Sequence, residues 1–565
     1  MPNSDPQDED NPRLVSIPEA PDYYEAVSED DKIDLSDDEL AKIPEREKIY
    51  GRSILATFSY GMVDPFLTTI AIDMGATGSQ MGWLRALSNL LGNFVQPVFG
   101  FLSDKIQRRS VFVALSNILY SSIWILLLFV NKVVMIIVIA SVISLVVSLG
   151  TPAWTALLGE IIPQKIRGKI IANVNWFSQF PYILSTILGG ILFNYIAGEL
   201  SIGSWTFQLN YFLPIAFGLV AGFASAFAIF SFKEKKARSR AQVLSKLLEK
   251  KTNRKSKIKS HEKEADSSVI ESVIINGKDS QAIASDGIEA ICVTTDVTKS
   301  LEISKDAETI EESFTIKVLE MFKNKDFRKF TIVFGIQSFF MSWCWPLFPI
   351  RQRSDIGANF LEIAIFSVVM SIATVITIRY AGGISDLIGR KPQMVMNRFI
   401  LVAMPISYMF ASQVWHIIVI HAIICIPLGL NSAVMQSYLI DVTPEKNRSL
   451  YVGFYNMFYG VILFLGSLLG GYLVDFLIGE ITIGGFSPFY SQYKAVTIAF
   501  AVGFVGRLTT AFPFLTLREV KTFPYKLRDL PRLVFRSKKL LALVSTVSFF
   551  FGFWLVIMGI MGYLP

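Results

Sequence analysis

The sequence is poor in the residues that most often bind metal ions or form cross-links. Its 565 residues include only three cysteines and three histidines. Cys292, Cys344 and Cys425 lie far apart, and their spacing indicates neither a disulfide framework nor a zinc site. His416 and His421 are five residues apart, whereas metal ligands on a helix usually stand four apart, so we interpret them as packing residues. We expect no bound metal.

The chain also lacks the short motifs with which many enzymes hold nucleotides or activate a nucleophile. It has no phosphate-binding glycine loop of the P-loop type, no histidine-rich cluster and no nucleophile elbow with matching partners. We therefore expect neither an enzyme nor a cofactor. The net charge of +6 does not indicate nucleic-acid binding, because much of the Lys and Arg sits in short loops between apolar runs.

Long apolar runs dominate the sequence. Hydrophobic residues make up 52% of the chain, and the mean hydropathy is +0.46 despite two long charged segments. Runs of about 20 residues, enough to cross ~30 Å of hydrocarbon, recur throughout. We predict an all-α polytopic membrane protein with twelve main spans. The first six are at about 53–74, 80–103, 110–130, 133–157, 169–197 and 209–232, and the second six at about 328–350, 360–384, 393–412, 414–438, 450–478 and 494–517.

Polar segments divide the chain into five regions. Residues 1–48 are acidic, and we expect a disordered tail with a short helix before the first span rather than a secretory signal. Two six-helix bundles, 49–232 and 328–517, are joined by the charged and mostly disordered linker 233–327. Residues 518–565 hold a basic stretch and an apolar segment long enough for a thirteenth span, with a re-entrant or surface helix as the alternative.

The two groups of spans are copies of one unit. Glu160 and Arg167, after the fourth span, return as Asp441 and Arg448 after the tenth, with one offset: 441 − 160 = 281 and 448 − 167 = 281. The same offset relates Gly189-Gly190 to Gly470-Gly471 and Pro65 to Pro346. A constant shift across several helices indicates a tandem duplication, which is typical of secondary transporters.

Each copy carries a charged loop between its second and third spans. The two sequences are GFLSDKIQRR at 100–109 and GGISDLIGRK at 382–391. Both resemble the G-x-L-A-D-R-x-G-R-K signature of the major facilitator superfamily, with departures at Gln107 and Leu387. The resemblance covers about 53–517. It implies two six-helix halves with pseudo-twofold symmetry that rock against each other around a shared solute cavity.

The resemblance also implies a gating role for the motif residues. In this family, charged pairs hold the two halves together on the cytoplasmic side and separate as the protein opens inward. Each pair need contribute only ~1 kcal/mol to bias two states. The alternative is a charged loop that only sets topology. The gating residues are Gly100, Asp104, Arg108, Arg109, Glu160 and Arg167 in the first copy, and Gly382, Asp386, Gly389, Arg390, Lys391, Asp441 and Arg448 in the second.

Loop charges predict the orientation. Basic residues such as Arg108, Lys165 and Lys446 gather on one side of the spans, whereas the other side has few, with Arg351 and Arg353 as exceptions. The positive-inside rule places the N-terminus and the linker in the cytoplasm. We expect an integral protein of the cell (plasma) membrane that works as a monomer in the lipid bilayer.

The strongest functional candidate is Asp64, near the middle of the first span. A charge at the bilayer centre costs at least ~2.5–3.5 kcal/mol, so such residues are functional candidates by default. Pro65 beside it can loosen the helical backbone. The carboxylate could take up a proton or bind a cationic group. The alternative is a static partner for Arg85 or for a free backbone group.

Other polar residues within the spans are candidates for binding the solute. An arginine facing a cavity can hold an anion, and amides with aromatic residues suit a polar organic molecule. The alternative for each is a hydrogen bond between helices. The full set is Asp64, Arg85, Asn89, Asn93, Gln96, Asn175, Trp176, Gln179, Gln337, Trp343, Arg379, Asn431, Gln436, Tyr455, Asn456 and Tyr459.

These features predict a secondary active transporter. It would move a small polar or amphipathic organic solute by alternating access, coupled to protons through Asp64. Two alternatives remain open. The first is a facilitative uniporter on the same fold, in which Asp64 is structural. The second is a membrane receptor or scaffold that acts through its tails and linker without transporting anything.

Overall fold

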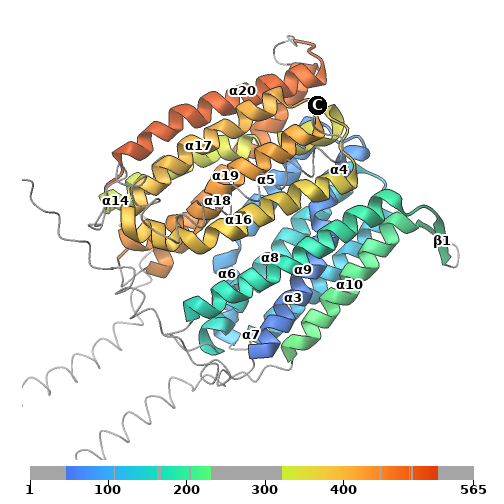
Figure 1. Cartoon of the computed structure of the whole chain (residues 1–565), viewed down its shortest axis with the longest axis horizontal. Coiled ribbons are helices and arrows are strands. Elements are labelled where there is room, and N and C mark those ends of the chain that lie inside the picture. Colours follow the sequence, from blue (N-terminus) through green and yellow to red (C-terminus); the bar gives the residue numbers. More distant parts are fainter. Residues whose placement is uncertain are drawn as a thin grey trace, which may run out of the picture.

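The computed structural model describes residues 46–106, 109–161, 167–202, 205–230, 321–444, 448–482, 484 and 488–519. The expectations for the acidic tail, for nearly all of the linker and for the thirteenth span lie outside these ranges. Within them the chain is almost wholly helical, as the apolar runs predict (Figure 1).

The first half begins with a helix that is broken near its middle. Pro65 cannot donate a backbone hydrogen bond, and the chain changes there from α-helix to a 3-10 turn. The elements of this half are α3 (Arg46–Val63), η1 (Asp64–Phe66), α4 (Leu67–Asp73), α5 (Gly78–Phe94), α6 (Gln96–Ile106), α7 (Arg109–Ile123), η2 (Trp124–Phe129), α8 (Val133–Ile161), α9 (Arg167–Tyr195) and α10 (Leu209–Phe230).

The second half repeats this plan, including the broken first helix. Its elements are α14 (Lys325–Trp343), α15 (Leu347–Ile350), the π-helical turn η3 (Arg351–Asp355), α16 (Phe360–Ile388), α17 (Arg390–Phe410), α18 (Val414–Val442), α19 (Arg448–Ile478), α20 (Gln492–Ala511) and η4 (Phe512–Thr516). Figure 1 shows the two halves side by side, with their helices running in the same general direction.

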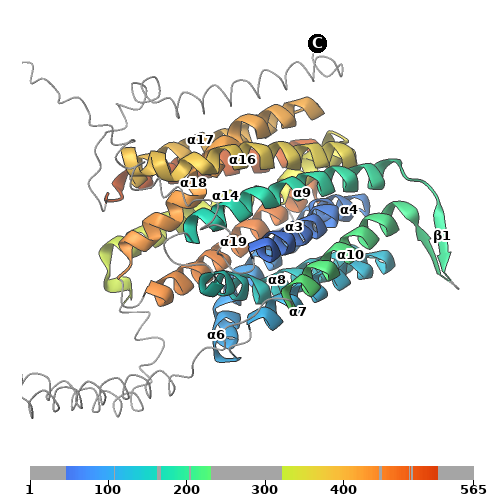
Figure 2. The ribbon, with the colours of Figure 1, turned by 60° about the horizontal axis from the view of Figure 1, so that its bottom comes forward.

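An antiparallel hairpin was not expected from the sequence. Strands β1 (Glu199–Ile202) and β2 (Trp205–Gln208) pair between α9 and α10, with Glu199 opposite Gln208. The hairpin projects beyond the ends of these two helices (Figure 2). We call this end of the molecule the hairpin end. The opposite end, where α6 meets α7 and α16 meets α17, carries the two charged loops and is called the motif end.

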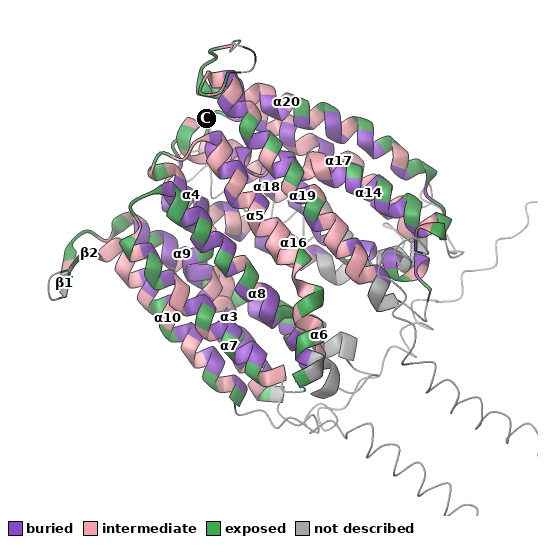
Figure 3. Cartoon of the chain, turned by 180° about the vertical axis from the view of Figure 1, so that it is seen from behind, coloured by how far each residue is buried: buried purple, intermediate pink, exposed green. Residues whose placement is uncertain are grey.

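Nine helical segments of the described ranges are long and apolar enough to cross a membrane. The predicted spans that correspond to α5 and α17 are not among these nine. The helix α5 has only 17 residues and contains Arg85, and α17 contains Arg398 and begins with Arg390 and Lys391. Large apolar side chains are exposed on outer helix faces, as on α10, and these faces suit contact with lipid (Figure 3).

The repeated glycine pairs hold helices in close contact. A Cβ on Gly189 would come within 2.6 Å of the Met62 carbonyl oxygen on α3, and one on Gly190 within 2.7 Å of Ala364 on α16. One glycine thus packs α9 on the first helix of its own half, and the next packs it on the other half. Small residues at such contacts let helices approach closely in a membrane.

The second glycine pair does the same in the second half. Gly470 lies against Trp343 of α14, within its own half. Gly471 lies against Gly78 and Gly82 of α5, in the first half. The duplicated sequence therefore produces two equivalent interfaces, α9 with α16 and α19 with α5. This relationship confirms the pseudo-twofold arrangement expected from the repeat.

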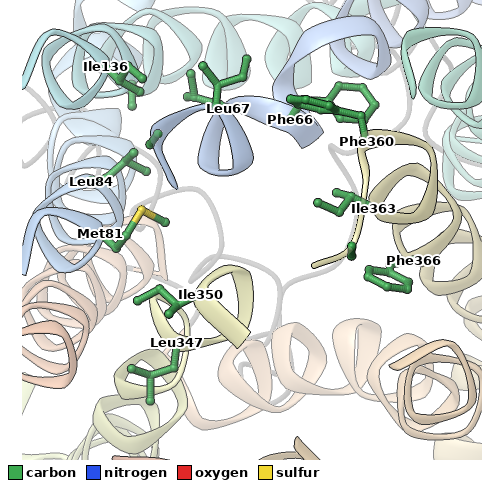
Figure 4. Packing of buried hydrophobic residues seen from close by; sticks show 14 of the residues in the cluster. Phe66, Leu67, Met81, Leu84, Ile136, Leu347, Ile350, Phe360, Ile363 and Phe366 are labelled. Atoms are coloured by element: carbon green, nitrogen blue, oxygen red, sulfur yellow. The ribbon is translucent and has the colours of Figure 1, made fainter. Parts of the chain in front are cut away.

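Aromatic and aliphatic side chains fill the junction of the halves toward the hairpin end. Phe66 of η1, Phe193 of α9 and Phe360 of α16 lie together, with ring centroids 5.0 to 6.0 Å apart. Figure 4 shows the rings of Phe66 and Phe360 next to each other, with Ile363 one turn further along α16. These residues are buried, so the junction is closed at this level.

Candidate functional site

Asp64 lies at the break in the first helix. It is the first residue of η1, directly after the last α-helical residue of α3. Its side chain is solvent-accessible although it lies deep among the helices, because it lines a cavity of about 480 Å³. The break that Pro65 introduces therefore places a carboxylate on the wall of an internal, water-accessible space.

The cavity lies within the first half, between α3, α5, α7 and α8. Its polar walls include hydroxyls and amides as well as two charged side chains. Those used below are Arg52, Tyr60, Asp64, Asn117, Tyr120, Thr151 and Trp154. Polar groups, aromatic rings and a few aliphatic side chains together suit a small amphipathic molecule.

Charged and titratable groups surround Asp64 from four helices. The guanidinium of Arg85 on α5 lies within electrostatic range of its carboxylate. Tyr60 on α3, Tyr120 on α7 and Tyr182 on α9 are also within electrostatic range. Within the part of the chain that the structure describes, no side chain forms a hydrogen bond to the Asp64 carboxylate. Among the described residues, the Asp64 carboxylate therefore takes no part in a side-chain hydrogen-bonding network.

Arg52 lines the same cavity, twelve residues before Asp64 on α3. Its guanidinium lies 4.1 Å from the ring centroid of Trp154 and donates to Asn117 Oδ1 at 3.3 Å. Asn117 in turn donates to Ser225 Oγ at 2.9 Å. Sequence analysis did not select Arg52, because a basic residue near the start of a span usually reaches the membrane surface. Only the tertiary structure shows that its side chain is buried.

The amides predicted on α5 are largely satisfied by their own helices. Asn93 donates to the Asn89 carbonyl at 2.8 Å, and Gln96 donates to the Gly92 carbonyl at 2.7 Å. Asn89 donates to Ser467 Oγ of α19 at 3.5 Å, across the two halves. None of the three lines the cavity around Asp64. Their contacts favour the alternative interpretation, in which they stabilise helices and the interface between halves.

The candidates in the second half have mixed surroundings. The Trp343 indole is buried and donates to the Ala499 carbonyl at 3.0 Å, so it joins α14 to α20. Gln337 is fully buried, and its amide has no hydrogen-bond partner among the described residues. The rings of Tyr455 and Tyr459 stack on each other, and both pack at a tilt against Phe334.

The remaining candidates are less informative. Asn175 and Trp176 are exposed, and Gln179 and Asn456 are partly buried. Trp176 packs edge-on against two phenylalanines of its own helix. The side chains of three more candidates lie outside what the structure describes; they are Arg379, Asn431 and Gln436.

Polar contacts join the two halves at the hairpin end. The carboxylate of Asp73, at the end of α4, pairs with Arg353 of η3 through both of its oxygens, at 2.5 and 2.9 Å. Asp475 of α19 accepts a hydrogen bond from the backbone N–H of Ser79, at the start of α5, at 2.8 Å. A carboxylate suits this position, because the first N–H groups of a helix have no partner within it. Arg353, an exception to the loop-charge pattern, therefore has a structural role.

At the motif end, Arg390 and Arg109 each make contacts within their own half. Arg390 pairs with Asp441 and donates to the Ser437 carbonyl at 2.7 Å, which joins α17 to α18. Arg109 donates to the Ala156 carbonyl at 3.2 Å, which joins α7 to α8. We expected such pairs to hold the two halves together. These contacts do not test that expectation, so the gating role stays a prediction.

One further acidic residue contacts the motif of the second half. Glu519, just after η4, accepts a hydrogen bond from the Lys391 backbone N–H at 2.8 Å. This contact places the Glu519 carboxylate at the start of α17. The residue just before that helix is Gly389, whose φ of 96° suits only glycine. Partial burial raises the pKa of the Glu519 carboxyl above its ordinary value of 4.5.

Comparison with known proteins agrees with this architecture. The family model of the Major Facilitator Superfamily matches residues 52–261 and 330–565. The class H tetracycline resistance protein of Pasteurella multocida is 32% identical over 136 residues, 23% of this chain and 33% of that protein. Vacuolar basic amino acid transporter 1 of Saccharomyces cerevisiae is 26% identical over 169 residues, 30% of this chain and 28% of that protein. The alignments thus span about a third of these curated relatives.

Solved structures share the fold at low sequence identity. An auto-inhibited POT family peptide transporter has a TM-score of 0.55 at 10% identity, covering 86% of this chain and 99% of that chain. The nucleoside transporter NupG has a TM-score of 0.53 at 10% identity, covering 84% of this chain and 100% of that chain. Because the family model matches most of the residues in both halves, the chain belongs to the major facilitator superfamily and is a membrane transporter rather than an enzyme.

Proposed function

We propose that this protein is a secondary active transporter that couples proton movement to the transport of a small polar or amphipathic organic solute. The observation that supports this most strongly is the position of Asp64. An ionisable carboxylate lines a water-accessible cavity at a break in a membrane helix, and no described side chain forms a hydrogen bond to it. Such residues in membrane spans commonly mark ion or proton pathways.

The arrangement of contacts between the halves supports alternating access. The Asp73–Arg353 pair and the Asp475–Ser79 hydrogen bond close the hairpin end. If loop charge sets the orientation as expected, the motif end faces the cytoplasm and this conformation is closed to the outside. Rocking of the halves about the α5–α19 and α9–α16 interfaces would then expose the cavity to the other side.

The substrate is not transferred from the relatives. Their names indicate a tetracycline-resistance protein in one case and a basic amino acid transporter in the other, and each alignment covers only part of that protein. The facilitative alternative differs from our proposal only in the role of Asp64. The receptor alternative is not favoured, because the family and the cavity both indicate transport.

A two-stage experiment tests the proposal. First, thermal shifts of the purified protein are measured with matched panels of sugars, amino acids, carboxylates, nucleosides, peptides and drugs, because a ligand of the folded state stabilises it. A stabilising solute is then tested in liposomes that contain a pH-sensitive dye. Solute gradients should drive proton movement in the wild-type protein and not in Asp64→Asn.

The control is Asn93→Ala, a helix residue that does not line the cavity around Asp64. It should keep proton movement per folded molecule close to the wild-type value. Solute transport that proceeds without proton movement in the wild type, or equal proton movement in Asp64→Asn, would contradict the coupling role and favour a facilitative carrier.

A further inference from the structure

We propose that the transported solute carries an anionic group, such as a carboxylate or phosphate, and that Arg52 binds this group inside the cavity of the first half. The inference rests on the proposed function, because it assigns the substrate class of the same cavity. It depends on three observations: the lack of an acidic partner for Arg52 among the described residues, the charge balance of the cavity, and the separation of Arg52 from Asp64.

Arg52 is a buried cation that has no acidic partner among the residues that the structure describes. Its side chain is only 9% exposed, and among the described residues it forms no ion pair. The neutral contacts to Asn117 and Trp154 hold the guanidinium in place, while its Nε is buried without a hydrogen bond. Burial of an uncompensated guanidinium is costly, and an anion in the cavity would offset that cost.

The charges around the cavity favour an anion. Asp64 and Arg85 lie within electrostatic range of each other, and their formal charges of opposite sign cancel in the charge count of the site. Counting Arg52, Arg85 and ionised Asp64 together, the site has a net formal charge of +1, which is the charge of Arg52. Protonation of Asp64 raises that charge to +2. Binding of an anion and protonation of Asp64 therefore favour each other, which is the coupling that proton-driven uptake requires.

The separation of the two groups favours an elongated solute. Asp64 lies twelve residues after Arg52, at the break that directly follows α3, which corresponds to a rise of roughly 18 Å between their backbones. Both side chains line one cavity, whose intervening wall carries Tyr60 and Tyr120. A solute with an anionic end at Arg52 and an aromatic or polar body along the tyrosines fits this surface.

A purely structural role for Arg52 makes a different prediction. In that case the arginine only ties α3 to α7 and α8, and its charge does not affect what enters the cavity. The second half offers a matched comparison. Arg398 occupies the position equivalent to Asn117, since 398 − 117 = 281, and lies over Phe334 and Phe514. It is also buried but does not line the cavity of the first half.

Cysteine labelling distinguishes the two roles without knowledge of the solute. Thr151 is exposed and lines the cavity, so Thr151→Cys provides a reporter in a Cys292→Ser background. Cys344 and Cys425 are buried. Purified protein in detergent is treated with anionic sulfonatoethyl or cationic trimethylammonium-ethyl methanethiosulfonate. The rate of labelling by each reagent is divided by its rate of reaction with 2-mercaptoethanol in solution, and the ratio of the anionic to the cationic value is then taken.

Removal of the Arg52 charge should lower this ratio by about fivefold. Arg52 and Thr151 line the same cavity, and one charge in a partly screened cavity changes the local concentration of small ions by about that factor. Arg52→Gln and Arg52→Met are both used, since methionine keeps the packing on Trp154 if glutamine prevents folding. Arg52→Lys and Arg398→Gln should leave the ratio unchanged. Asp64→Asn should raise it.

An equal ratio in the wild-type and neutral Arg52 proteins would overturn the proposal, as would failure of the anionic reagent to reach Thr151→Cys when the cationic reagent does. A stabilising solute without an anionic group, equally effective in Arg52→Gln, would overturn it too. The labelling requires no transport, so its outcome is independent of the liposome test. If the neutral Arg52 variants keep the wild-type ratio while proton coupling is intact, the anion site alone is rejected. If these variants lower the ratio but proton coupling is absent, the coupling alone is rejected.

Discussion

Arg353 and Asp73 form a two-pronged ion pair between the broken first helices of the two halves. Both Asp73 oxygens accept from the guanidinium, and the same arginine donates to the Ala358 carbonyl at 2.7 Å and lies over Phe360. The pair is partly exposed, with 25% and 27% of the two side chains accessible. Its geometry is favourable, but solvent screens it, so it biases the conformation rather than fixing it.

Asp73→Asn should shift the protein toward opening at the hairpin end. Loss of a partly exposed ion pair changes the balance of two states by about 1 kcal/mol, or roughly fivefold in their ratio. Distances between spin labels on the hairpin ends of α4 and α16 report that ratio. The double variant Asp73→Arg with Arg353→Asp, which exchanges the two charges, should return the ratio of the two states toward the wild-type value. A double variant that is shifted further toward opening than Asp73→Asn would argue against a direct interaction.

Gly471→Val should prevent close contact of α19 with α5. The added side chain would meet the Gly78 backbone, which cannot move aside as a flexible side chain can. Overpacking of this kind costs about 1–3 kcal/mol, so we expect a lower melting temperature and at least a tenfold loss of transport. Gly453→Ala on the same helix is the control, because its Cβ would meet only Pro97, at 3.9 Å. Equal losses in both variants would disprove the close-contact argument.

Arg507→Met should destabilise the second half without changing the solute preference. Arg507 is buried and donates to the carbonyls of Phe340, Met341 and Leu401, at 3.0 to 3.2 Å. Methionine keeps the length of the side chain but leaves all three acceptors without this donor, at a cost of about 3 kcal/mol. Thermal unfolding in detergent measures the loss.

The matched control is Lys494→Met, an exposed position on the same helix, where the change should stay within about 0.5 kcal/mol. A shift in the relative transport of two solutes by folded Arg507→Met protein would instead indicate a role for Arg507 in binding.

Glu519 predicts a dependence of stability on pH. Its raised pKa means that the folded protein holds this proton more tightly than the unfolded chain does. The stabilisation is therefore complete below pH 4.5, the ordinary value, and disappears as the pH rises through the raised value. The melting temperature of the wild type minus that of Glu519→Gln should fall across this window and then level off. A difference that grows with pH would contradict the raised pKa.

Much of the fold follows from periodicity and repetition in the sequence. The runs that predicted spans at 360–384 and 414–438 correspond to α16 and α18, which begin at the expected residues and extend four residues further. Pro65 and Pro346 share the offset of the repeat, Pro65 was expected to loosen its helix, and both first helices break near these prolines. These features are local or depend on a constant offset, so a single sequence contains enough information to find them.

The site was only partly predictable, because burial and pairing depend on distant segments. Asp64 was selected since its position in an apolar run is a local signal. Arg52 was missed, because only α7 and α8 make its position internal. The pairing of Arg353 with Asp73 spans 280 residues, and no spacing rule connects them. The amides of α5 were selected for their shared face, but a shared face does not show whether it meets a cavity or another helix.

The short segment from Asp64 to Asp73 carries both the candidate proton acceptor and the acid of the ion pair. It consists of the 3-10 turn η1 and the helix α4, and the turn interrupts the α-helix between α3 and α4. Nine residues separate the two carboxylates, about 13 Å along a helix. Because Asp73 is paired with Arg353 of the opposite half, we expect a change of charge at Asp64 to be felt at this pair. Occupancy inside the protein and opening at its mouth would then be mechanically coupled.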